Sequence, residues 1–264
     1  MSTYTEFKIN RVKEGVKSST TDVLAEEVPV ALVYNGISHI VLMTTPADLA
    51  ELVLGFSLSE GILQQPSELY DLEIQEVCNG IEVRMEIASS RFQALKERRR
   101  NMGGRTGCGL CGIDSLNAVK PVLPFVSRNN NSVKESEIQS ALTHFQQYQN
   151  LRNLTGSVHG AAWIERGRVM AAFEDVGRHN ALDKLLGWGI QQKVDWRDGF
   201  ALISSRASYE MVAKAATLGI GCLVAVSAPT AMAVRLAEEA GITLIGFAKL
   251  RQFSIYTHPQ YIEV

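Results

Sequence analysis

The chain has 264 residues, of which 46% are hydrophobic and 20% are charged. This length and apolar content suffice for one large domain or two small ones, and they exclude a wholly disordered chain. The 26 basic and 28 acidic residues give a net charge of −2. A global positive field that would hold nucleic acid or an anionic membrane is therefore excluded, and a bound polyanion would need a local basic patch.

Apolar residues nowhere form a run of 18 or more, and the N-terminal segment is polar where a signal peptide would be apolar. The sequence thus predicts a soluble, cytoplasmic protein that binds neither membrane nor nucleic acid. Its four cysteines, Cys78, Cys108, Cys111 and Cys222, are too few for a disulfide scaffold of this size. We expect them to be reduced thiols.

The first hundred residues are typical of a small α+β unit. Residues 1 to about 25 are polar without periodicity, so we expect an arm that is ordered only where something holds it. Two strand pairs are predicted around Asn-Gly turns, because both residues tolerate the positive φ of a type I′ turn. Along the chain we expect strands at 28–34 and 39–43, a helix at 45–61, and strands at 72–77 and 81–87.

The middle of the chain changes in composition. Five basic residues occur between Lys96 and Arg105, and five glycines surround Cys108 and Cys111. Such glycine density opposes regular structure, so a mobile, positively charged loop is predicted at about 96–113. The polar stretch at 126–131 is typical of a linker. We therefore divide the chain into an N-terminal domain, 1–125, and a C-terminal domain, 126–264.

Strands alternate with helices in the second half of the chain. This order predicts an α/β fold with a mainly parallel sheet, helices on both faces, and ligands at the carboxyl ends of the strands. Trp163, Trp196 and Cys222 are expected in the core, and His159 is expected to be structural rather than a ligand contact. The predicted helices are 133–148, 180–186, 208–218 and 230–240, and the predicted strands are 160–165, 168–173, 200–204, 222–226 and 243–247.

The sharpest local pattern is Arg105-Thr106-Gly107-Cys108-Gly109-Leu110-Cys111-Gly112. Two thiols at this spacing can bind a metal, exchange disulfides or carry sulfur as a persulfide. Zinc is disfavoured because Cys78 and Cys222 do not supply a second close pair. A thioredoxin-like dithiol would follow a strand and open a helix, whereas this pair lies in a glycine-rich stretch far from such a unit. The basic neighbours lower the thiol pKa and the glycines allow the loop to move, so the composition favours a sulfur carrier. The alternative is a pair of surface cysteines without a function.

Two further polar clusters follow neighbouring predicted strands. Arg178 and His179 open one helix, and Ser204 and Arg206 precede the next. Free amides at helix N-termini favour an anionic phosphate or nucleotide there. The alternative is ordinary helix capping by Asn180 and Ser208, with Asp183 and Lys184 on a solvated face. Basic Lys249 and Arg251, beyond the last predicted strand, also suit an anionic ligand.

Taken together, these segments resemble the formate dehydrogenase accessory sulfurtransferase family, FdhD. The resemblance rests on RTGCGLCG at 105–112, FEDVGRHNALDKLLG at 173–187, SSRASYEMVAKAA at 204–216 and FAKLRQ at 247–252. It implies a cytoplasmic homodimer that accepts sulfur from a cysteine desulfurase as a cysteine persulfide. The sulfur then passes to molybdenum bis(molybdopterin guanine dinucleotide), bis-MGD, before this cofactor enters the formate dehydrogenase apoenzyme.

The resemblance also assigns roles to residues. Cys108 is expected to carry the persulfide, with Cys111 supporting it, and the C-terminal domain is expected to be similar to cytidine deaminases. Guanine nucleotides are expected to mimic bis-MGD, which is bound as a substrate. The expected cofactor-binding residues are Arg178, His179, Ser204, Arg206, Phe247, Ala248, Lys249, Leu250, Arg251 and Gln252.

Two other functions remain as alternatives. A chaperone would bind the molybdenum cofactor without transferring sulfur, and its cysteines would sense redox state. A nucleoside deaminase would need zinc, but neither a Pro-Cys-x-x-Cys turn nor the catalytic glutamate follows His179. We therefore expect neither a bound metal nor structural zinc.

Overall fold

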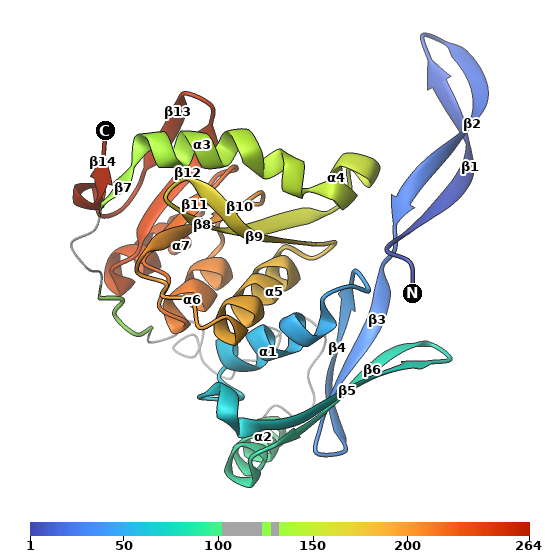
Figure 1. The fold of residues 1–264 in the computed structure, drawn as a ribbon. Helices are drawn as coiled ribbons and strands as arrows, with labels where there is room; N and C mark the ends of the chain where they lie inside the picture. Colours follow the sequence, from blue (N-terminus) through green and yellow to red (C-terminus); the bar gives the residue numbers. More distant parts are fainter. Residues whose placement is uncertain (102–122, 128–131) are drawn as a thin grey trace.

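The computed structural model describes residues 1–101, 123–127 and 132–264. An N-terminal hairpin and four-stranded sheet precede a six-stranded sheet, with a helical joint between the two sheets (Figure 1). The N-terminal elements are β1 (Tyr4–Lys13), β2 (Val16–Ala25), β3 (Val28–Tyr34), β4 (Ile37–Thr44), α1 (Leu49–Ser59), η1 (Pro66–Glu68), β5 (Leu69–Val77), β6 (Gly80–Ile87) and α2 (Ser89–Asn101).

The C-terminal elements alternate as the sequence predicts. They are β7 (Val133–Lys134), α3 (Glu135–Phe145), η3 (Gln146–Tyr148), α4 (Asn150–Thr155), β8 (His159–Glu165), β9 (Arg168–Asp175), α5 (Arg178–Gln191), β10 (Gly199–Ile203), α6 (Tyr209–Thr217), β11 (Cys222–Ala225), α7 (Ala231–Ala240), β12 (Thr243–Lys249), β13 (Gln252–Ile255), η4 (Pro259–Tyr261) and β14 (Ile262–Glu263).

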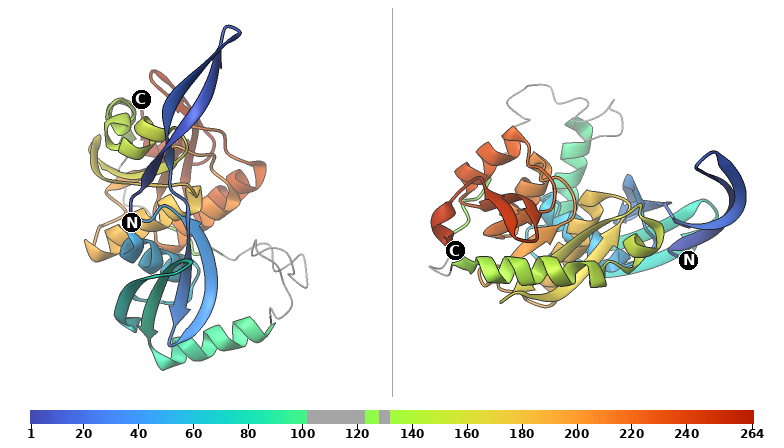
Figure 2. Two further views of the ribbon diagram at one scale, coloured as in Figure 1. Left: turned by 90° about the vertical axis from the view of Figure 1, so that its right-hand side faces the viewer. Right: turned by 90° about the horizontal axis from the view of Figure 1, so that it is seen from above.

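The expected arm is a regular β-hairpin, which corrects the reading of residues 1–25. Strands β1 and β2 pair along their full length around Glu14 and Gly15, whose φ angles are 51° and 79°. This is the positive-φ pair of a type I′ turn. Phe7, Ile9 and Leu24 share one face of the ribbon, an alternation that polar neighbours obscure. Figure 2 shows the hairpin projecting from the body of the molecule.

The predicted hairpin at Asn35-Gly36 is confirmed in the four-stranded sheet, whose order is β4-β3-β6-β5. Asn35 and Gly36 have φ angles of 45° and 78°. In the second hairpin Val77 pairs with Gly80, so the turn residues are Cys78 and Asn79 rather than Asn79 and Gly80. Helix α1 starts at Leu49, later than predicted, after Asp48 in a left-handed conformation.

Helix α2 replaces the first part of the predicted mobile loop. It runs from Ser89 to Asn101, so residues 96–101 are helical. Arginine and lysine are good helix formers, which accounts for a helical conformation of the basic run at 98–100. Cys108, Cys111 and the rest of the predicted loop lie outside the described residues.

The six-stranded sheet is mixed, so the prediction of a mainly parallel sheet is wrong in its pairing. Its order is β13-β12-β11-β10-β8-β9, in which β10, β11 and β12 pair in parallel and the three outer pairs are antiparallel. The short turn Arg166-Gly167 forces β8 and β9 into a hairpin, since a parallel pair needs a long crossover.

Helices cover both faces of this sheet, as predicted. Side chains of α3 pack against one face, and α5, α6 and α7 pack against the other (Figure 1). Trp163 is fully buried and meets Trp196 edge to face at 4.8 Å, and Cys222 is also fully buried. The core positions of all three residues are thus confirmed. Gly241 ends α7 with a φ of 76°, a left-handed cap of the kind that glycine favours.

The two sheets are joined through helices α1 and α5. A Cβ at Gly55 would lie 1.9 Å from the Asp183 carbonyl oxygen, and a Cβ at Gly187 would lie 1.9 Å from the Glu51 carbonyl oxygen. Glycine at both positions therefore lets the helix backbones touch. Because α1 packs on the four-stranded sheet and on α5 at once, nearly every residue of α1 is shielded from water.

Candidate functional site

The candidate site is the edge of the six-stranded sheet where β9, β10, β11 and β12 end and β8 begins. Three loops meet along this edge. Ala207 pairs with Pro229 in an isolated bridge, the amide of Thr230 donates to the Ala207 carbonyl, and the amide of Phe247 donates to the Ser227 carbonyl at 3.1 Å. Residues predicted from separate motifs therefore share one rim, which we call the strand-end rim.

Arg178 and His179 open α5 directly after Gly177, which supplies no side-chain cap. Nε2 of His179 lies 2.7 Å from Oε2 of Glu210 on α6, and both side chains are about one-third exposed. The hydrogen bond from His179 is the main reason that the pKa of Glu210 falls below its ordinary value, although partial burial opposes this shift. Glu210, which the sequence reading did not select, therefore orients His179 on the rim.

His159, expected to be structural, lies on the same rim as the first residue of β8. It pairs with Asp175 across the β8–β9 ladder. Partial burial lowers the pKa of His159, and the positive charges of Arg152, Arg178 and His179 lower it further, while Asp175 opposes them. Basic side chains of α4 and α5 therefore lie near enough to His159 to oppose its protonation.

The serine cluster after β10 is partly structural. Oγ of Ser204 accepts the Gly160 amide at 2.9 Å, and the Ser204 amide donates to the Gly160 carbonyl, so Ser204 fixes β10 to β8. Arg206 is exposed on the rim. Ser208 is the N-cap residue of α6, yet its side chain makes no capping bond. The capping alternative is therefore wrong for Ser208.

Asn180 is not a helix cap either. Its side-chain amide donates to the Met43 carbonyl at 2.8 Å and to Oδ1 of Asp175 at 2.9 Å. Both bonds lie in the joint with the N-terminal sheet, because Met43 belongs to β4. In the first turn of α5, Arg178 and His179 thus belong to the rim, whereas the side chain of Asn180 belongs to the joint.

The segment at 247–252 forms the end of β12 and the turn into β13. Phe247 and Arg251 have positive φ angles of 52° and 65°, and Ala248 is buried. The Arg251 amide donates to Oε1 of Gln139 on α3 at 2.7 Å. Across the described residues no hydrogen bond or ion pair joins this segment to the other predicted cofactor residues. Its exposed members are Phe247, Lys249, Leu250, Arg251 and Gln252.

Two buried charge clusters were missed by the sequence reading. Nζ of Lys184 lies 2.8 Å from Oδ2 of Asp175, and both side chains are fully buried. The Thr45 amide also donates to Asp175, at 3.1 Å. The predicted solvated face at Asp183 and Lys184 is therefore wrong, because α5 is wedged between α1 and the sheet.

The second cluster surrounds Lys214 of α6. Its Nζ lies within hydrogen-bonding distance of both Asp183 carboxylate oxygens, at 3.0 Å, of Ser59 Oγ at 2.9 Å and of Glu60 Oε1 at 2.8 Å. Burial raises the pKa of Asp183, while Lys214 partly offsets this shift. Asp183 and Lys214 come from the C-terminal elements, and Ser59 and Glu60 are the last residue and the C-cap of α1, so the cluster links the two sheets beneath the rim.

Helix α2 brings the chain that leads to Cys108 near this second cluster. Nη1 of Arg98 donates to the Glu60 carbonyl at 2.8 Å, and Glu60 contacts Lys214. The described chain of α2 ends three residues later, at Asn101. Cys108 and Cys111 themselves lie outside the described residues, and the structure does not place them relative to the rim.

The described part of the chain holds no group of three or more His, Cys, Asp or Glu side chains arranged to bind a metal. Cys78 is exposed at a hairpin turn, whereas Cys222 is buried in the six-stranded sheet. The cysteines that are described thus belong to different sheets.

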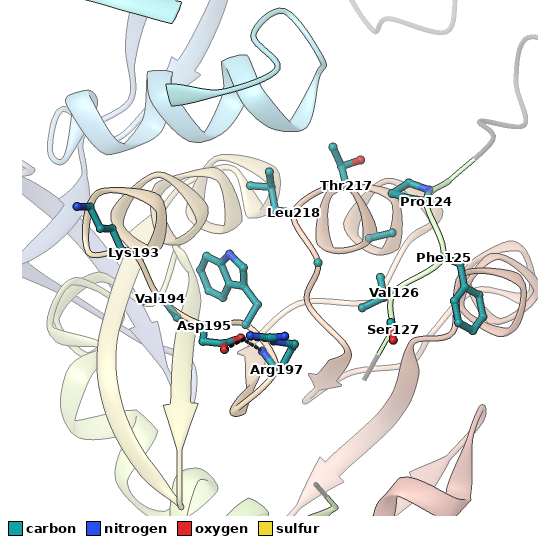
Figure 3. A pocket seen from close by; sticks show the side chains of 13 residues that line it. Pro124, Phe125, Val126, Ser127, Lys193, Val194, Asp195, Arg197, Thr217 and Leu218 are labelled. Carbon is teal, nitrogen blue, oxygen red and sulfur yellow. Dashed lines mark hydrogen bonds and ion pairs between the residues drawn. The ribbon is translucent and has the colours of Figure 1, made fainter. Parts of the chain in front are cut away.

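A cavity of about 710 Å³ lies at the opposite edge of the sheet, before β10 and β11 (Figure 3). Its polar wall includes Asp195 and Arg197, which bind each other at 2.7 Å and so satisfy their own charges. Arg197 holds the pKa of Asp195 at about 2. Because the sequence motifs meet at the other edge, we place the candidate site at the rim rather than in this cavity.

Among the described helices, none combines the length and apolarity that a membrane crossing requires. A solved structure from Desulfotalea psychrophila, assigned as a formate dehydrogenase accessory protein, matches with a TM-score of 0.77 and 22% identity. The match covers 99% of this chain and 100% of that chain. At this identity the match supports the fold alone.

Sequence comparison gives a closer relationship. The chain is 52% identical over 262 residues to the "Sulfur carrier protein FdhD" of Cupriavidus necator, covering 99% of this chain and 91% of that protein. The sequence model of the FdhD/NarQ family matches residues 25–263, which include both sheets and the rim. The chain therefore belongs to the FdhD/NarQ family.

Proposed function

We propose that this protein is a sulfur carrier that serves formate dehydrogenase. The observation that carries the proposal is the 52% identity, over nearly the full length, to a protein named as a sulfur carrier. The Cys108-Gly-Leu-Cys111 motif supplies thiols suited to this role. Sulfur carriage requires a nucleophilic thiolate, and nearby arginines favour the thiolate over the thiol.

The first chemical step is an exchange of one sulfur atom. The Cys108 thiolate attacks the outer sulfur of a persulfide on a cysteine desulfurase. The bond to that sulfur forms as the donor's sulfur–sulfur bond breaks, and the donor cysteine leaves as a thiolate. Cys108 then carries the persulfide, and no external oxidant or reductant is needed. Cys111 acts as the supporting thiol.

In the second step the Cys111 thiolate attacks the inner sulfur of Cys108, so the Cys108–Cys111 disulfide forms as the persulfide bond breaks. The outer sulfur leaves at the sulfide level and binds the molybdenum of bis-MGD, which the strand-end rim holds as a substrate. A dithiol reductant then restores the two thiols. The cofactor carries diphosphate groups, and Arg178 and Arg206 contribute guanidinium groups to the rim. Among the described residues, no carboxylate lies within ion-pair distance of the Arg178 or the Arg206 guanidinium group. Helices α5 and α6 also begin at this rim, and helix N-termini favour anions. His179, Ser204 and the segment Phe247 to Gln252 complete the proposed binding surface.

In this proposal the protein is a sulfurtransferase that acts as a homodimer in the cytoplasm. It takes sulfur from a cysteine desulfurase and passes the sulfurated cofactor to the formate dehydrogenase apoenzyme. The fold of the C-terminal domain is proposed to be deaminase-like without deaminase activity, because the sequence lacks the Pro-Cys-x-x-Cys ligands.

A cofactor chaperone without sulfur transfer is the second candidate, and the rim alone would suffice for it. The two are separated by incubating the protein with a cysteine desulfurase and cysteine, and then measuring the mass of the peptide that contains Cys108. The transferase gains one sulfur atom on this peptide, and Cys108→Ala does not. Cys78→Ala is the matched control, because Cys78 is an exposed cysteine outside the motif.

Formate dehydrogenase activity provides the second readout. Cells that carry Cys108→Ala are expected to lose this activity, whereas cells with Cys78→Ala retain it. Full activity with Cys108→Ala would refute sulfur transfer and favour the chaperone.

A further inference from the structure

Three polar atoms on the strand-end rim are buried and have no hydrogen-bond partner among the described residues. They are Nδ1 of His159, Nε of Arg178 and Oγ of Ser208. Buried polar groups in folded proteins are nearly always paired, and an orphaned group indicates a missing water, ion or ligand. These three atoms belong to β8, α5 and the N-cap of α6, whose ends lie side by side on the rim.

The acidic groups near the rim are already engaged. Glu174 accepts the Leu151 and Arg152 amides at 2.8 Å, Asp175 is paired with buried Lys184, and Glu210 contacts His179. In contrast, Arg178 has no carboxylate partner in the described part of the chain. Its positive charge is therefore available to a ligand, and that ligand must supply acceptors.

We propose that His159, Arg178 and Ser208 form a phosphate-binding subsite in which His159 takes up a proton as the anion binds. This inference deepens the proposed function, because the subsite would hold a phosphate of the nucleotide part of bis-MGD. A phosphate oxyanion fits better than a carboxylate, since its several oxygens can accept from donors that three different elements supply. His159 and Ser208 add to the binding surface that the sequence reading selected.

The linked proton follows from the surroundings of His159. Burial and the charges of Arg152 on α4 and of Arg178 and His179 on α5 disfavour imidazolium, against the opposing charge of Asp175 on β9. Glu174, the next acidic residue on β9, is held by backbone amides of α4. A bound phosphate adds negative charge at this point and raises the pKa of His159. The contribution of His159 to affinity therefore rises as pH falls, because its imidazole binds more protons in the complex than in the unliganded protein. The comparison with His159→Gln at each pH removes the contribution of the ligand's own protonation, since the ligand is the same in both titrations.

The test is calorimetric titration of the full chain with inorganic pyrophosphate and, separately, with guanosine diphosphate, between about pH 5 and pH 8. Comparison of the two probes separates recognition of the phosphates from recognition of the nucleoside. We expect both probes to bind and guanosine not to compete for this subsite. We expect Arg178→Gln to weaken the binding of both probes by about tenfold or more, as for loss of a charged hydrogen bond.

The pH dependence isolates the role of His159. His159→Gln is expected to weaken binding at about pH 5 and to flatten the dependence on pH, while it leaves affinity at about pH 8 within about twofold. Arg178→Lys keeps the charge and is expected to recover part of the affinity. Arg168→Gln is the matched control, because Arg168 is an exposed arginine at the opposite end of β9. Circular dichroism and Tm establish that each variant is folded.

Three results would overturn the subsite: no binding of pyrophosphate and guanosine diphosphate, equal affinity in Arg178→Gln and wild type, or an unchanged pH profile in His159→Gln. Its failure is distinguishable from failure of the proposed function. If pyrophosphate does not bind but Cys108 still gains sulfur from a desulfurase, the subsite is wrong and sulfur carriage stands. If pyrophosphate binds as described but Cys108 gains no sulfur, the subsite stands and sulfur carriage is wrong.

Discussion

Replacement of Lys214 by methionine tests whether the buried charge cluster holds the two sheets together. Methionine replaces the aliphatic part of the side chain but removes the ammonium group that contacts Asp183, Ser59 and Glu60. Asp183 is 1% exposed, so water cannot replace the lost partner, whereas Glu60 is 37% exposed and can be solvated. Removing one partner of a buried pair typically costs about 3–5 kcal/mol.

That loss is a large fraction of the about 5–15 kcal/mol that stabilises a typical domain. We therefore expect Lys214→Met to reduce the free energy of unfolding by about 3–5 kcal/mol at neutral pH. Urea unfolding followed by the fluorescence of buried Trp163 and Trp196 measures this change. Lys17→Met is the matched control, because Lys17 is an exposed lysine of the hairpin, and we expect it to unfold like wild type.

The same variant has a predicted pH dependence. Burial already raises the pKa of Asp183, and loss of Lys214 removes the charge that opposes this rise. A raised carboxyl pKa gives stability that is present at low pH and lost as pH rises, so the deficit of Lys214→Met should shrink on acidification. Adding Asp183→Asn should restore much of the loss, because no buried charge remains. A deficit below about 1 kcal/mol, or a double variant no more stable than Lys214→Met, would refute this reasoning.

Three further predictions concern packing and local electrostatics. Gly55→Ala should cost about 1–3 kcal/mol or more in urea unfolding, because the new Cβ would lie 1.9 Å from the Asp183 carbonyl oxygen; wild-type stability would contradict the close helix contact. His179→Gln should raise the pKa of Glu210 toward its ordinary value and so reduce the stability lost on acidification through Glu210. Carbon NMR of the carboxyl group measures the shift, and an unchanged pKa would exclude the His179 contact as its cause. Arg197→Gln should raise the pKa of Asp195 from about 2 toward 3.8 without a measurable change in Tm, since the pair is exposed; a large drop in Tm would contradict this.

Much of the C-terminal fold was predictable because its elements are strongly patterned. The alternation of apolar strands with helices predicted every main element from β8 to β12. Strand direction was less accessible. The hairpin of β8 and β9 depends on the short Arg166-Gly167 turn, and β13 follows a positive-φ turn at Arg251 that the sequence reading did not recognise.

The position of the candidate site was predicted from the sequence, but which residues face the rim and which join the two sheets was not. Arg178, His179 and Arg206 lie on the rim as expected, because each follows a strand end. Asp175, Asn180, Asp183 and Lys184 from the same motif instead bond the two sheets together. No local signal separates the two sets, since the burial of Lys184 depends on α1, which lies far away in sequence.

Residues near the rim were missed for a related reason. His159 was expected to be structural, and Glu210 lay in the 204–216 motif without an assigned role. Only tertiary packing brings these two residues to Arg178 and His179. Conversely, arginines at 98–100 were read as part of a mobile loop, although their helix propensity extends α2 to Asn101.

The central claim is that Cys108 carries sulfur to the cofactor on the rim. The most direct measurement follows radiolabelled sulfur from cysteine, through a desulfurase and this protein, to bis-MGD isolated from formate dehydrogenase. We predict that label appears first on Cys108 and then on the cofactor, and that Cys108→Ala abolishes both signals. Labelled cofactor formed in the presence of the Cys108→Ala protein would contradict the account.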